Sequence, residues 1–119
     1  MNPRQKLYIK ALEKAILDLH GCKAKWVESI PIKEIFEGET VWEGVVQVFG
    51  LIDYPKATRC YAWSHGLDKS KKRRFFAVLH QGVVDSPQAA VKAAIVSDVR
   101  FYRGKKSEGK NKRSGTAII

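Results

Sequence analysis

The stretch TRCYAWSH, Thr58 to His65, decides the fold that this sequence predicts. Arg59, Tyr61, Trp63 and His65 occupy every second position, and small side chains fill the positions between them. Alternate residues of a β-strand point to opposite faces, so one face is aromatic and basic and the other is small. Because helices pack closely over small side chains, we expect the small face to lie under helices and the aromatic face to be the outer face of a sheet.

Helical patterns frame this strand on both sides. Apolar residues at helical spacing, with capping residues at both ends, predict a helix over Pro3–His20. Ser86 followed by Pro87 begins a second, alanine-rich helix that we expect to run to about Tyr102. The chain between the two helices has the composition of strands and turns.

Four strands are expected between the helices. The first contains Pro31, which cannot donate to a ladder, so it should be an edge strand. Gly44, on the inner face of the second, indicates a bulge or a close backbone approach. The predicted class is α+β, a two-layer sandwich in which a four-stranded antiparallel sheet carries two helices on one face, in the order αββββα. The strands are expected at Lys25–Phe36, Val41–Phe49, Thr58–His65 and Phe75–Gln81.

The length of 119 residues predicts one domain. We expect residues 1–103 to form a single globular α+β domain and residues 104–119 to form a flexible basic C-terminal tail, because the tail has too little apolar content to pack. No apolar run is long enough for a membrane span and no signal peptide is visible, so the expected location is cytoplasmic. The cysteines, Cys22 and Cys60, are expected to be free and buried.

The net charge of +10 is concentrated in two segments. Asp68–Arg74 has five basic residues and one acidic, and Arg103–Arg113 has six basic and one acidic. The rest of the chain then has 11 basic and 10 acidic residues, a net charge of +1. An even number of antiparallel strands between the helices predicts that the two segments meet at one end of the molecule.

This distribution favours a non-catalytic nucleic-acid-binding domain, with RNA as the favoured partner. A basic loop and a basic tail can neutralise phosphates, and an aromatic sheet face can stack unpaired bases. Tyr61 and Trp63 are the expected base contacts, and Arg59 is an expected phosphate contact. The other expected phosphate contacts are Lys69, Lys71, Lys72, Arg73, Arg74, Arg103, Lys105 and Lys106.

Three alternatives stay open from the sequence. The aromatic face could serve a protein-interaction module or a homodimer, and the basic segments could bind an acidic protein. Tyr61 and Trp63 could instead point inward as core. An enzyme or small-ligand binder without a readable motif is less favoured, because no catalytic motif is present. No cofactor or metal is predicted, since Cys60 and His65 should lie on opposite faces of the sheet.

Overall fold

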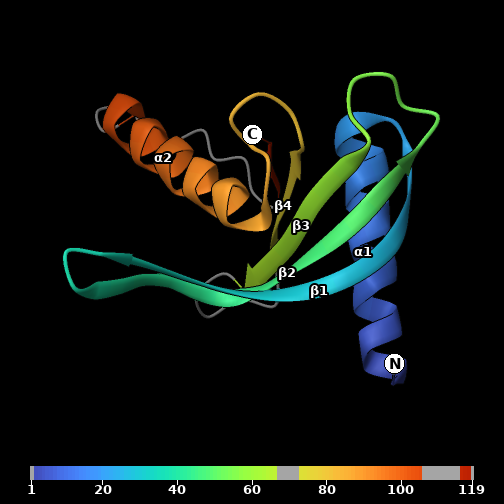
Figure 1. The fold of residues 1–119 in the computed structure, drawn as a ribbon, viewed down its shortest axis with the longest axis horizontal. Coiled ribbons are helices and arrows are strands. Elements are labelled where there is room, and N and C mark those ends of the chain that lie inside the picture. Colours follow the sequence, from blue (N-terminus) through green and yellow to red (C-terminus); the bar gives the residue numbers. More distant parts are fainter. Residues whose placement is uncertain (1, 67–72, 106–115, 119) are drawn as a thin grey trace.

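The computed structural model describes residues 2–66, 73–105 and 116–118. It confirms the α+β class and the predicted order of a helix, four antiparallel strands and a second helix. No helix in these ranges is long and apolar enough to cross a membrane. The elements are α1 (Pro3–His20), β1 (Lys23–Phe36), β2 (Glu39–Ile52), β3 (Arg59–Gly66), β4 (Arg73–Leu79), α2 (Pro87–Lys105) and β5 (Thr116–Ile118) (Figure 1).

The first helix begins and ends at the predicted residues because local contacts cap both ends. The Asn2 side chain accepts a hydrogen bond from the backbone N–H of Gln5 (2.8 Å), and the Gln5 side chain accepts one from the backbone N–H of Asn2 (3.1 Å). At the other end Gly21 has a φ of 73° and donates to the carbonyl of Leu17. Glycine adopts this left-handed conformation without steric cost.

The sheet has five strands in the order β1-β2-β3-β4-β5, with β5 parallel to β4 and all other neighbours antiparallel. The sequence did not indicate β5. β1 and β2 form a long hairpin, closed by a turn in which Glu37 and Gly38 both have positive φ. Gly44 is paired in register with Ile32, and a Cβ at Gly44 would lie 3.0 Å from Cη2 of Trp42. The space beside the Cα atom of Gly44 is therefore occupied by the indole ring of Trp42 and not by another backbone segment.

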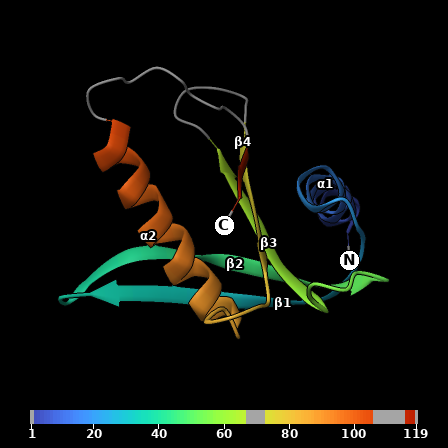
Figure 2. The same cartoon turned by 90° about the horizontal axis from the view of Figure 1, so that it is seen from above.

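The two helices lie on opposite faces of the sheet, which differs from the expected placement of both on one face (Figure 2). The small residues of β3 do lie under a helix, α1, as predicted. The large residues of β3 are also covered, by α2, so both faces of this strand are buried. The core on the α1 side contains Leu12, Ile16, Phe49, Cys60, Ala62 and Ala77; the core on the α2 side contains Val46, Val48, Tyr61, Trp63, Phe76, Val78 and Val91.

Both cysteines are free and buried on the α1 side, as predicted. Beside them, Nε2 of His20 donates a hydrogen bond to the carbonyl of Ala77 (2.8 Å), which ties the end of α1 to β4. Within the described ranges, no three histidine, cysteine, aspartate or glutamate side chains are grouped so as to hold a metal ion.

Candidate nucleic-acid interface

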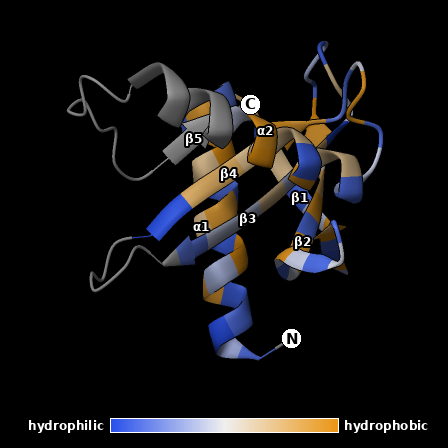
Figure 3. Ribbon diagram, turned by 90° about the vertical axis from the view of Figure 1, so that its left-hand side faces the viewer, coloured by the Kyte–Doolittle hydropathy of each residue, from blue (hydrophilic) through white to orange (hydrophobic). Residues whose placement is uncertain are grey.

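The end of the sheet where β3 stops and β4 starts carries the described part of the predicted basic loop. Gly66 pairs with Arg73 and His65 pairs with Arg74, so both arginines begin β4 at the rim of the sheet. The predicted phosphate contacts Lys69, Lys71, Lys72 and Lys106 lie outside the described residues. Figure 3 shows the start of β4 and the first turns of α1 as hydrophilic segments.

Arg73 is exposed, and its guanidinium group is fixed on the α1 side of the sheet. Its Nε donates to Oγ of Ser64 (2.9 Å), and its Nη2 donates to the carbonyl of Ser64 (3.1 Å). The backbone N–H of Ser64 in turn donates to the hydroxyl of Tyr8 in α1 (3.0 Å). These contacts place the first half of α1 beside this end of the sheet.

Arg74 lies on the other face of the same end, because adjacent strand residues point in opposite directions. Its guanidinium carbon is 4.9 Å from the centre of the Phe76 ring, within the range of a cation–π interaction. The exposed His65 ring lies 5.3 Å from the same phenyl ring. Phe76 stacks on Trp63 with centroids 5.1 Å apart and an interplanar angle of 7°. The buried rings of Trp63 and Phe76 therefore provide the surface that the side chains of His65 and Arg74 contact at this end.

The predicted base-stacking platform is wrong, because α2 covers the face on which it was expected. The relative exposure of Tyr61 is 3% and that of Trp63 is 2%. The alternative that both side chains point inward as core is confirmed. Among the described residues Nε1 of Trp63 has no hydrogen-bond acceptor.

The buried hydroxyl of Tyr61 is part of a separate polar pair. Its Oη shares a hydrogen bond of 2.6 Å with Nδ1 of His80. Burial raises the pKa of the Tyr61 hydroxyl, and the positive charge of Arg59 opposes this shift in part. The hydrogen bond to His80 gives the buried Tyr61 hydroxyl a polar partner inside the α2-side core.

Arg59 is exposed, but it does not lie with Arg73 and Arg74. It begins β3 and pairs with Gly50, whereas Arg73 pairs with Gly66 at the last position of the same strand. Seven steps of about 3.3 Å separate the two ends of β3, roughly 23 Å. Arg59 therefore lies at the opposite end of the sheet.

Arg103 and Lys105 lie in the last turn of α2, and the structure describes only their place along this helix. Figure 2 shows the end of α2 and the start of β4 toward the same side of the molecule, while Figure 1 shows them apart. Most of both basic segments lies outside the described residues. Their meeting at one end of the molecule therefore stays a prediction.

The side chains that position Arg73 are not among the residues that the sequence predicts for this interface. Ser64 and Tyr8 hold Arg73, and half-buried Phe75 pairs with Ser64 at the same end. His65 belongs to the alternating stretch of β3, but it is not among the predicted contacts. The direction of α1 could have indicated these residues, because it brings Tyr8 beside the end of β3 that contains Ser64.

No protein-family model matches this chain, and no curated protein or solved structure matches it either.

Proposed function

We propose that this chain binds nucleic acid without catalysing a reaction, and that RNA is the favoured partner. The interface is the basic end, defined as Arg73 and Arg74 together with the predicted contacts Lys69, Lys71 and Lys72. Arg103, Lys105 and Lys106 of the C-terminal segment are the further contacts in this proposal. Arg59 is not part of it, because it lies at the opposite end of the sheet. Tyr61 and Trp63 are not part of it either, because both side chains are buried under α2.

One observation carries the proposal. Arg73 and Arg74 begin the same strand, and a different contact orients each guanidinium group: two hydrogen bonds to Ser64 for Arg73 and the Phe76 ring for Arg74. An oriented guanidinium group loses less conformational entropy when it binds a phosphate. The two arginines also adjoin the residues in which the sequence concentrates its lysines.

Aromatic side chains at the same end favour RNA with unpaired bases. His65 is exposed, and Tyr8 and Phe75 are half-buried. Proteins that recognise single-stranded RNA commonly stack bases on such rings and bind the backbone with neighbouring cations. A homodimer formed through the aromatic sheet face is not proposed, because α2 covers that face.

The experiment compares two double variants with the same change of charge. Arg73→Gln with Arg74→Gln alters the basic end, whereas Lys23→Gln with Lys25→Gln alters exposed residues at the opposite end of the sheet. Binding of a labelled single-stranded RNA is measured by fluorescence anisotropy over a range of salt. The arginine variant should bind more weakly. The negative slope of log K against log salt should become shallower by about 0.7 for each lost phosphate contact.

The lysine variant is expected to keep the wild-type affinity and slope. Equal losses in the two variants would show that net charge alone attracts the RNA, and the basic end would then not be the interface. A duplex of the same sequence should bind more weakly than the single strand. Equal binding of duplex and single strand would remove the role given to the aromatic rings.

A further inference from the structure

The far part of the β1–β2 hairpin, residues 30–45, forms an arm that projects past both helices (Figure 1). α2 covers one face of the arm. On the other face Pro31 pairs with Val45, and a shallow hollow of about 270 Å³ extends from this pair to Lys33, Glu43 and the neighbouring backbone. The apolar contacts that the structure describes for α1 lie elsewhere, on the half of the sheet that contains Phe49.

The arm exposes apolar side chains. Phe36 is 63% exposed, and this part of the hairpin also exposes Ile35, Val41 and Val45. Isolated apolar residues are common on protein surfaces, but a group of them on one projecting element is typical of a surface that contacts another protein.

The arm is also acidic in an otherwise basic chain. Its charged residues are Lys33, Glu34, Glu37, Glu39 and Glu43, which gives a net charge of −3, while the whole chain has +10. A surface that combines apolar and acidic side chains requires a partner surface that combines apolar and basic ones.

The outer side of α1 has that composition. Leu7 is 70% exposed, and Leu17 is 47% exposed three turns further along the helix. From Pro3 to Leu12 the helix has basic residues, including Lys6 and Lys10, and no acidic residue, which gives this half a net charge of +3. The arm and the first half of α1 therefore have opposite charge, and each exposes a large apolar side chain, Phe36 on the arm and Leu7 on α1.

We propose that this chain forms a homodimer in which the arm of each copy docks on the outer side of α1 of the other copy. The arm and α1 lie at opposite ends of the longest axis of the molecule, whose extents are 40 × 31 × 30 Å (Figure 1). Two copies placed side by side in opposite directions form both contacts at once. Such a reciprocal arrangement is closed, as in most homodimers. It uses other residues than the nucleic-acid proposal: Arg73 and Arg74 take no part in it, and the Tyr8 hydroxyl contacts Ser64 of the sheet, not the outer side of α1.

Sedimentation equilibrium provides the first test. The purified protein should show twice the mass of one 13.4-kDa chain. A mass of one chain at every protein concentration would overturn the proposal.

A charge exchange then identifies the surfaces. Glu37→Lys with Glu39→Lys reverses the charge of the arm, and Lys6→Glu with Lys10→Glu reverses that of α1. Each variant alone should be monomeric, because like charges meet at both contacts of its dimer. An equimolar mixture of the two should regain the dimer mass, since every contact in the mixed dimer joins opposite charges. Dimers of either variant alone, or a mixture that stays monomeric, would contradict this pairing.

A matched pair of apolar changes tests the arm without altering its acidic residues. Phe36→Glu should raise the dissociation constant of the dimer by about tenfold or more, as expected for a central interface residue. Val83→Glu introduces the same charge at an apolar side chain that is 88% exposed between β4 and α2, outside the arm, and should leave the constant unchanged. Equal effects of the two variants would place the interface elsewhere. Because both sites are exposed, circular dichroism should show the wild-type fold in each.

Discussion

At the scale of single residues, Cys60 links burial to the response of the fold to pH. Its side chain is fully buried on the α1 side of β3. Burial raises the pKa of the thiol from the ordinary 9.0 to about 12. Burial also raises the pKa of the neighbouring Tyr61 hydroxyl. In both groups the folded state holds the proton more tightly than the unfolded state.

The folded protein should therefore lose stability in alkaline solution. A raised pKa in the folded state stabilises it fully below the unfolded pKa, and this contribution is lost as the pH rises toward the folded pKa. Between pH 9 and 12 the free energy of unfolding should fall by up to about 1.4 kcal/mol per pH unit for the Cys60 proton, and the raised pKa of Tyr61 should add to this fall above pH 10. Urea unfolding at a series of pH values measures the slope.

The variant Cys60→Ala separates the thiol from the other alkaline groups. It should lower the stability at neutral pH, because it removes a buried side-chain atom, but it should flatten the alkaline slope. A slope identical to that of the wild-type protein would mean that the thiol does not contribute.

The alternating residues of β3 predict part of their surroundings but not all of them. The pattern of Cys60 and Ala62 against Tyr61 and Trp63 predicts a strand with two unlike faces, and the structure has this strand. The pattern does not tell whether an aromatic face is open or covered, because both surroundings accept tyrosine and tryptophan. The side chains that cover this face include Val91 and Ala94 of α2, which are about thirty residues away in the sequence.

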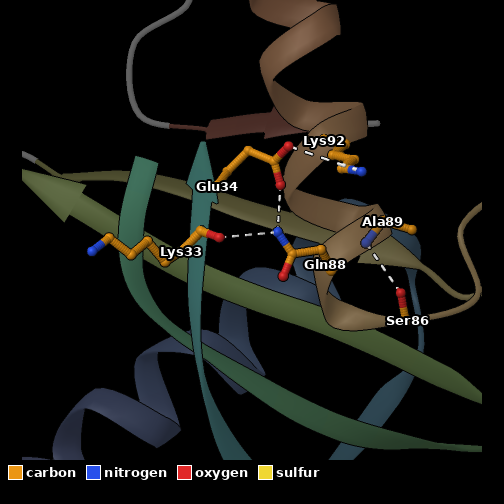
Figure 4. A network of polar contacts seen from close by, with 6 residues as sticks. All are labelled: Lys33, Glu34, Ser86, Gln88, Ala89 and Lys92. Carbon is orange, nitrogen blue, oxygen red and sulfur yellow. Dashed lines mark hydrogen bonds and ion pairs between the residues drawn. The ribbon is translucent and has the colours of Figure 1, made fainter. Parts of the chain in front are cut away.

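At the scale of elements, three polar contacts between described residues tie α2 to the arm (Figure 4). The side-chain N–H₂ of Gln88 donates to the carbonyl of Lys33 (3.3 Å) and to a carboxylate oxygen of Glu34. Nζ of Lys92 lies 3.9 Å from the other oxygen of Glu34. Ser86 caps the same helix by accepting from the backbone N–H of Ala89 (3.1 Å). The first turns of α2 are thereby fixed on one face of the hairpin.

Gln88→Ala should destabilise the protein by about 1–2 kcal/mol, because it leaves the half-buried carboxylate of Glu34 without its amide donor. Lys92→Ala should cost less than about 0.5 kcal/mol, since this lysine is 61% exposed and the ion pair is long. Urea unfolding at neutral pH measures both. The control is Gln81→Ala, which alters an exposed glutamine; a loss as large as that of Gln88→Ala would contradict the role of the amide.

The elements themselves were predictable to different degrees. Pro3–His20 was predicted without error, because the capping residues are local signals. β1 and β2 extend further than predicted, to residues 23 and 52, because strand ends have no comparable signal. β5 consists of Thr116–Ile118, a length too short to show a period, and its pairing with β4 depends on contacts distant in the sequence.

At the scale of the whole molecule, each face of the sheet is covered by one helix, and the candidate interfaces lie at the margins. The basic end lies at the rim where β3 meets β4, and the acidic arm projects from the far part of the hairpin. The sequence predicted the charge of the basic loop but not the arm, because exposure of Ile35 and Phe36 depends on how far each helix reaches. The sequence of the hairpin itself does not indicate how far the two helices extend over it.

Because β3 pairs on both sides and is covered on both faces, its backbone should be the most protected part of the chain. Amide hydrogens of Cys60 to Trp63 should exchange with deuterium only when the whole domain opens, whereas those near the tip of the arm should exchange through local openings. Exchange followed by NMR measures both rates, and equal protection of the two segments would contradict this order. The stretch most sheltered from solvent would then be the same one whose alternation first predicted a strand.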